Sequence, residues 1–79
     1  MTPKELFNEL LTQKGYASMY EFCMKNQLDY ANMNKRVNGK KQKIEIPFAF
    51  KLANLLKVPV DTIIKIFYPQ EYQENQDLL

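Results

Sequence analysis

Histidine is absent from this sequence, and cysteine occurs only once in its 79 residues. Without histidine, the chain lacks the commonest metal ligand and the usual general base near neutral pH. One cysteine excludes an internal disulfide framework, as expected in a reducing compartment. No stretch approaches the roughly 18 apolar residues needed to span a bilayer, and no signal-peptide pattern begins the chain. We therefore expect a cytoplasmic protein with no membrane partner.

The chain also lacks the residue patterns of an enzyme. Its acidic residues are scattered, and it has no glycine-rich loop that would hold a phosphate. Neither metal-ligand spacing nor a nucleophile–base pair can be built without histidine. A chain of this length has room for a small core but not for a deep cleft as well. We expect no catalysis, no cofactor, no metal and no small-molecule substrate.

The composition is that of a soluble globular domain, with 46% hydrophobic and 25% charged residues. The charge is unevenly distributed along it. Residues 1–68 contain 11 basic and six acidic residues, a net charge of +5, whereas residues 69–79 contain three acidic residues and no base, a charge of −3. We expect one domain over residues 1–68 and a short acidic tail over residues 69–79.

The basic excess is concentrated in one short segment. Five basic residues fall within nine positions that contain no acid: Lys35, Arg36, Lys40, Lys41 and Lys43. Such a cluster is typical of a surface that binds a polyanion. The alternative interpretation is a solvated, lysine-rich loop with no partner.

Apolar residues recur at helical spacing through most of the chain, and no strand-like alternation extends beyond residues 43–46. The first helix is expected to begin after Thr2, with Pro3 at its first position and Glu5 at its third, and to end at Gly15. Further helices are expected at about 18–26 and 29–37, from Ile46-Pro47 to the break at 58–60, and from Asp61 to Pro69. The sequence therefore predicts an all-α fold of five helices.

The segment from Ser18 to Gly39 is the most informative. Ser18 and Glu21 have the spacing of a capping box, in which the hydroxyl and the carboxylate each accept a backbone N–H of the other residue. Asp29 supplies a cap oxygen for the next helix, and Gly39 allows it to end in a left-handed turn. Two short helices joined by a tight turn are therefore expected, resting on the rest of the chain.

This arrangement resembles the Cro/lambda-repressor type of helix-turn-helix domain over roughly residues 4–68. The matching pieces are Phe22-Cys23, Leu28-Asp29, Met33, Asn38-Gly39-Lys40, Leu52-Ala53, Leu56 and Val58. The resemblance implies a five-helix DNA-binding domain that inserts the helix at about 29–37 into the major groove of double-stranded DNA. It also implies a homodimer that reads two half-sites.

The chain departs from the family pattern at several positions. Family members often carry Ala at Cys23, an apolar residue at Asn26, Gly at Gln27 and an apolar residue at Arg36. They often join the first and third helices by an Arg–Glu pair, whose positions hold Thr12 and Val37 here. We expect apolar packing to replace that ion pair.

If Met33 and Val37 point inward, helical periodicity places Ala31, Asn32, Lys35 and Asn38 on the outer side of the third helix, with Tyr30 and Asn34 flanking them. Asn can pair with adenine, Lys can donate to guanine, and the Ala methyl can contact a thymine methyl. The resemblance assigns base reading to Tyr30, Ala31 and Lys35. It assigns phosphate contacts to Asn38 and Lys40, which Lys41 and Lys43 would extend.

Each of these residues also has a purely structural interpretation. The asparagines at 32, 34 and 38 can be solvated, and Tyr30 can lie half in the core with its hydroxyl in water. Cys23 is expected to be a small buried hydrophobe. The aromatic residues Phe48, Phe50, Phe67 and Tyr68 are expected in the core, although part of this set, with Tyr72 and the terminal leucines, can instead form a dimer surface.

The sequence and the resemblance lead to two hypotheses for the function. The first is a sequence-specific DNA-binding transcriptional regulator: a Cro-like repressor of phage, mobile-element or antitoxin type. The alternative is a protein-interaction module, such as an antitoxin or regulatory partner-binding domain, that keeps the fold without reading DNA. The departures at Asn26, Gln27 and Arg36, the Ala at a reading position and the acidic tail motivate the alternative.

Overall fold

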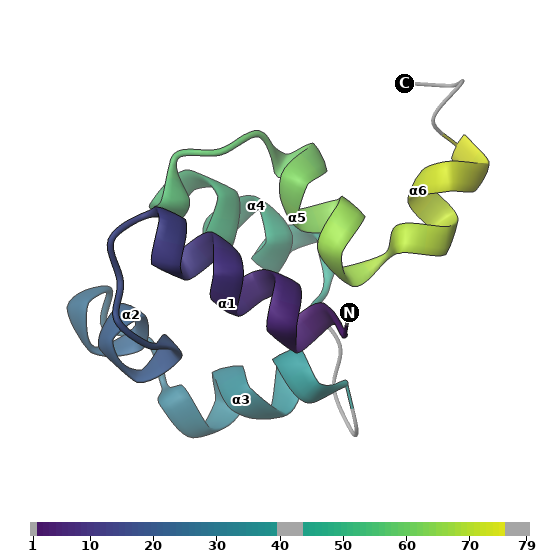
Figure 1. The fold of residues 1–79 in the computed structure, drawn as a ribbon. Helices are drawn as coiled ribbons and strands as arrows, with labels where there is room; N and C mark the ends of the chain where they lie inside the picture. The colour runs from purple at the N-terminus through teal and green to yellow at the C-terminus, as the bar shows by residue number, and fades with distance from the viewer. Residues whose placement is uncertain (1, 40–43, 76–79) are drawn as a thin grey trace.

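The computed structural model describes residues 2–39 and 44–75, and every regular element in these ranges is a helix (Figure 1). The fold is therefore all-α, as the sequence predicted. The helices are α1 (Pro3–Gln13), α2 (Met19–Lys25), α3 (Tyr30–Asn38), α4 (Ile46–Leu56), α5 (Val60–Phe67) and α6 (Pro69–Asn75).

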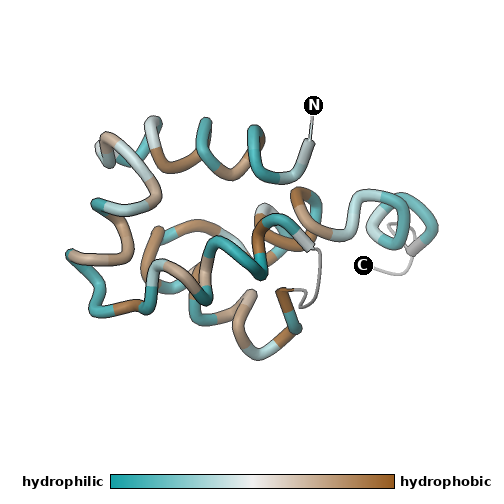
Figure 2. The backbone as a smooth tube through the Cα atoms, turned by 90° about the horizontal axis from the view of Figure 1, so that it is seen from below, coloured by the Kyte–Doolittle hydropathy of each residue, from teal (hydrophilic) through white to brown (hydrophobic). Residues whose placement is uncertain are grey.

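The expected count of five helices is wrong, because the described chain forms a sixth helix, α6, in the segment interpreted as a tail. Pro69 ends α5 as predicted, but it is also the first residue of α6. Proline is favoured there because the first helical N–H has no partner within the helix. The first backbone bond of α6 runs from Tyr72 N–H to Tyr68 O at 2.9 Å. The residues that follow are polar, so α6 is largely hydrophilic (Figure 2).

Helix α1 lies at the centre of the arrangement and packs on α2, α3 and α5 (Figure 1). Helices α4 and α5 pack against each other, and α3 lies at the edge of the molecule, where its Arg36 side chain contacts Phe48 of α4. Helix α6 packs on α5 and extends away from the rest. This arrangement leaves a long face of α3 without a covering helix.

The core is entirely apolar among the described residues (Figure 2). Rings from α1 and α2 meet at its centre: Phe7 and Phe22 lie edge to face with centroids 6.1 Å apart, and Phe67 packs on Phe7 at 5.5 Å. Cys23 is fully buried, as predicted, and burial raises the pKa of its thiol. Buried residues come from α1 to α5 and, at Ile44, from the segment before α4: Phe7, Leu10, Leu11, Met19, Phe22, Cys23, Met33, Val37, Ile44, Ala49, Leu52, Ala53, Leu56, Ile63 and Ile66.

The expectation that all four aromatic residues in the 48–68 region belong to the core is met only in part, because Phe48 and Phe67 pack against the core and Phe50 does not. Phe48, Phe67 and Tyr68 are half-buried, and the Tyr68 hydroxyl donates to Ile44 O at 2.6 Å. Phe50 is 51% exposed, because it lies one turn after the equally exposed Ile46 on the outer side of α4. An apolar pair thus stands on the surface of α4.

Three helices end in the same way. After α1, α2 and α4 the chain places one residue in the left-handed region, at Gly15, Gln27 and Lys57. The N–H of the next residue then bonds to a carbonyl five residues back, as in the Schellman motif. Glycine adopts this conformation without steric cost, whereas a residue with a Cβ loses about 1 kcal/mol. Only the first of these three turns was evident in the sequence.

The longest helices in the described ranges have 11 residues. None of the helices there is long and apolar enough to cross a membrane.

Candidate nucleic-acid interface

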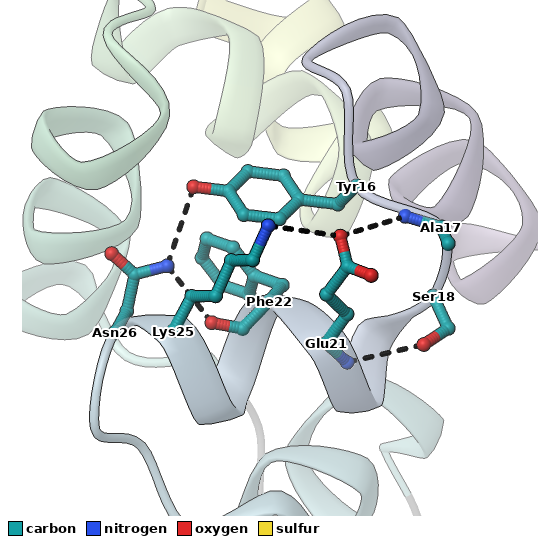
Figure 3. A network of polar contacts seen from close by, with 7 residues as sticks. All are labelled: Tyr16, Ala17, Ser18, Glu21, Phe22, Lys25 and Asn26. Carbon is teal, nitrogen blue, oxygen red and sulfur yellow. Dashed lines mark hydrogen bonds and ion pairs between the residues drawn. The ribbon is translucent and has the colours of Figure 1, made fainter.

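The start of α2 is held by polar contacts around Glu21 (Figure 3). Its backbone N–H donates to Ser18 Oγ at 3.1 Å, as the capping-box spacing predicted. The carboxylate does not complete the expected box. Its Oε1 accepts from Ala17 N–H at 3.3 Å, one residue earlier than predicted, and lies 3.4 Å from Lys25 Nζ. The Ala17 N–H is an equivalent donor that leaves the carboxylate within reach of Lys25, one turn along.

The turn between α2 and α3 contains two of the departures from the family pattern. Asn26 caps the end of α2, because its Nδ2 donates to Phe22 O at 2.8 Å and lies 3.4 Å from the Tyr16 hydroxyl (Figure 3). Gln27 has a φ of 57°, the left-handed conformation that glycine adopts most easily. Leu28 N–H then bonds to Cys23 O at 2.8 Å and closes the turn. The backbone here has the conformation that a glycine would take, although glycine is absent.

Both predicted ends of α3 are confirmed. Asn32 N–H donates to Asp29 Oδ1 at 3.2 Å at the start of the helix. At the other end, Gly39 is left-handed with a φ of 68°, and its N–H donates to Lys35 O and Arg36 O. A helix of nine residues is thus fixed at both termini by local bonds.

The two sides of α3 differ as the helical periodicity predicted. Met33 and Val37 are 1% and 4% exposed and belong to the core. Val37 therefore packs in the core, as expected at this position, but Thr12 does not join it. Thr12 is exposed, and its hydroxyl donates to Asn8 O at 3.1 Å within α1.

The outer side of α3 is polar and carries no acidic residue. The exposed residues there are Ala31, Asn32, Lys35 and Asn38, and Asn34 is half-buried at its margin. This surface offers amide donors and acceptors, one ammonium and one methyl group, which are the groups that read base edges. In Figure 1 no other labelled helix lies over this side of α3.

One flank of α3 borders a groove of about 340 Å³ between α1, the start of α2 and α3. Tyr30 and Asn34, one turn apart on α3, line it together with Lys4 and Asn8 of α1. Lys4 also borders a second cleft, of about 420 Å³, that reaches Asn38 at the other end of α3. A cation from α1 therefore lies beside the flank of α3. Sequence reasoning missed Lys4, because its position depends on how α1 crosses α3.

Sequence reasoning also missed Tyr20, on α2. Its ring lies 5.4 Å from that of Tyr30, at an interplanar angle of 74°, and the two side chains are 55% and 40% exposed. Tyr30 is therefore only partly buried, and its ring packs on a surface tyrosine rather than in the core. The sequence did contain a signal for the exposure of Tyr20. Met19 and Phe22 are apolar at helical spacing and are buried, and the same periodicity turns Tyr20 outward. Nothing in the sequence linked it to Tyr30.

The opposite flank of α3 faces α4. Arg36, another departure from the family pattern, makes the contact there. The Arg36 guanidinium carbon lies 4.9 Å from the centroid of the half-buried Phe48 ring. Arg36 Nε is buried, and none of the described residues accepts a hydrogen bond from it. Arg36 thus acts as a packing residue between α3 and α4, where a family member often has an apolar side chain.

Three further predicted residues, Lys40, Lys41 and Lys43, lie outside the described residues. The described part of the predicted interface is therefore α3 itself, with its core side buried, its polar side exposed and different neighbours on its two flanks.

Comparisons with models of known protein families, with curated proteins and with solved structures find no match to this chain.

The contact of Arg36 with Phe48 generates a stability prediction. Arg36→Ala removes both the cation over the ring and the packed aliphatic stem, so the free energy of unfolding should fall by about 1 kcal/mol. Arg36→Met keeps most of the stem and no longer buries Nε, so its stability should stay within about 0.5 kcal/mol of the parent. Urea unfolding of the three proteins measures both changes, and equal losses in the two variants would contradict a packing role.

Proposed function

We propose that this protein is a sequence-specific regulator of transcription that binds double-stranded DNA as a helix-turn-helix domain of the Cro/lambda-repressor type. In this proposal α2 and α3 form the motif, and α3 enters the major groove with its N-terminal residues against base edges. The protein represses by occupying an operator, and the proposal assigns it no catalysis.

The observation that carries the proposal is the division of α3 into a buried and an exposed side. Met33 and Val37 fix the helix to the core, and local caps at Asp29 and Gly39 fix its ends. A rigid helix is thereby presented with its polar side outward and no acid on it. A polyanion can approach this side without meeting like charge, and Lys35 stands at its centre.

The departures from the family pattern at Asn26, Gln27 and Arg36 do not count against DNA binding, because each has a local structural role. Asn26 caps α2, Gln27 occupies the left-handed position of the turn, and Arg36 packs on Phe48. None of the three lies on the exposed side of α3. Three of the observations that motivated a module without DNA reading are therefore explained by packing and turn geometry.

A second copy of the chain is part of the proposal, because one recognition helix reads only a few base pairs. The exposed pair Ile46 and Phe50 on α4 supports it. In an antiparallel contact of two α4 helices about a two-fold axis, Ile46 of one copy would lie opposite Phe50 of the other, as a self-complementary interface requires. A large apolar pair left in water on so small a domain favours a partner.

The second candidate function, a protein-interaction module, is favoured by one observation. The acidic segment forms the helix α6, which packs on α5 and extends from the domain. An ordered polar helix is a surface that a basic partner protein can bind.

Selection of bound sites from a random duplex library separates the two functions. A dimeric reader should enrich a motif of two related half-sites about 34 Å apart. If six or more phosphates are contacted, affinity for the enriched site should fall by about 10³ between 50 and 200 mM salt. A folded protein that enriches no motif and binds no duplex at 50 mM salt would instead be an interaction module.

Lys35 at the centre of the exposed side generates a second prediction. Lys35→Ala should relax the base preference at one position of each half-site, with a loss of discrimination of about 1–3 kcal/mol. Lys41→Ala should weaken all sequences alike and lower the salt slope by about one. Lys65→Ala is the matched control, because this exposed lysine lies on α5 and not on α3. Equal, sequence-blind losses from Lys35→Ala and Lys41→Ala would refute base reading by Lys35.

The apolar pair on α4 generates a third prediction. Phe50→Ser should weaken self-association at least about tenfold, because burial of half an aromatic side chain is worth about 1–2 kcal/mol. The fold should persist, since Phe50 is outside the core. Sedimentation over a concentration series measures the change. Met24→Ser, at an apolar position on α2 that is 59% exposed, is the control. An equal shift in both variants would exclude α4 as the specific contact.

A further inference from the structure

The contact between Tyr20 and Tyr30 joins the first turns of the two helices of the proposed motif. Tyr20 is the second residue of α2, and Tyr30 is the first residue of α3. Their rings meet edge to face with centroids 5.4 Å apart. This is a preferred geometry for aromatic pairs, and it is worth more than the area that it buries. Both side chains nevertheless remain exposed, Tyr20 to 55% and Tyr30 to 40%.

The contact restricts where the Tyr30 ring can lie. Tyr30 borders the groove of about 340 Å³ that runs between α3 and the Lys4 and Asn8 positions of α1. This groove offers the ring an alternative place, folded back against α1. The Tyr20 ring borders the same groove and contacts the Tyr30 ring at the start of α3.

We propose that Tyr20 is a positioning residue that determines specificity, because it holds the Tyr30 ring in place to contact a thymine methyl at one fixed base pair of the operator. This inference rests on the proposed function. The first residues of the inserted helix are the ones that reach base edges, and apolar groups there recognise the C5-methyl of thymine. The next residue, Ala31, is also exposed, and its methyl group adds to the apolar surface at the start of α3.

The proposed contact depends on the C5-methyl group of one thymine, and a change of that base can test it. Thymine differs from uracil only by the C5-methyl group, so replacing thymine by deoxyuridine removes the contact and leaves the base pairing unchanged. The ratio of affinities for the two duplexes therefore measures the methyl contact alone. A general loss of stability or of phosphate contacts would lower both affinities and leave this ratio unchanged.

The experiment uses the full chain and the duplex enriched from the random library. Each thymine is replaced in turn by deoxyuridine, and dissociation constants are measured for the parent and for Tyr20→Ala, Tyr30→Ala and the double variant. We expect the parent to lose about 3- to 10-fold in affinity at one thymine of each half-site. Tyr30→Ala should remove most of this discrimination and Tyr20→Ala should reduce it at the same thymine, with no loss in the double variant beyond that of Tyr30→Ala.

Two matched variants separate positioning from a structural role. Tyr20→Phe keeps the ring and should retain the discrimination of the parent. Met24→Ala removes another exposed apolar side chain of α2, one turn further along, and should also retain it. Thermal unfolding of Tyr20→Ala should occur within a few degrees of the parent, since Tyr20 is 55% exposed.

The outcomes distinguish this inference from the proposed function. If the parent enriches a motif but Tyr20→Ala keeps the full thymine discrimination, the positioning role is wrong and the DNA-binding function stands. If all the variants lose affinity for thymine and deoxyuridine duplexes alike, the positioning role is also wrong. If the folded parent enriches no motif, the proposed function fails, and the inference fails with it.

Discussion

The burial of one edge of α3 is the constraint on which the rest of the structure depends. Met33 and Val37 are the only residues of this helix in the core, and both lie on the side that faces α1. A nine-residue helix is too short to be stable alone in water, so these two contacts and the caps at its ends maintain it. Because so little of α3 is needed to hold it, most of its surface remains available to a partner.

In the short connection between α2 and α3, local hydrogen bonds stabilise a turn that lacks the glycine and the apolar residue often found there in the family. Gln27 accepts a left-handed backbone at a cost of about 1 kcal/mol, and the bond from Leu28 N–H to Cys23 O helps to offset it. Asn26 donates to Phe22 O twice at the end of α2, from its backbone N–H at 3.1 Å and from its side-chain Nδ2 at 2.8 Å. A turn can therefore keep its geometry while its sequence changes, because the geometry is fixed by backbone bonds and by the core on either side.

The two flanks of α3 give it a different environment on each side. Toward α4, Arg36 covers the Phe48 ring and contributes packing. Toward α1 and α2, a groove of mixed polar and apolar lining and the Tyr20–Tyr30 contact leave aromatic surface in water. A cation from α1, Lys4, stands beside the second flank. Under the proposed function, specificity therefore depends on α1 and α2 as well as on the helix that enters the groove.

The sequence by itself determined where most helices begin and which side of α3 is buried. Caps at Thr2, Ser18 and Asp29 act within one turn, and periodicity is set by the helix alone, so both are local properties. The tertiary structure decided the features that depend on which helices meet. These are the exposure of Phe50, the packing of Arg36, the contact of Tyr20 with Tyr30 and the extension of the chain into α6. Side chains 10 or more residues apart come together only when the core fixes the crossing of their helices, and no local pattern encodes that crossing.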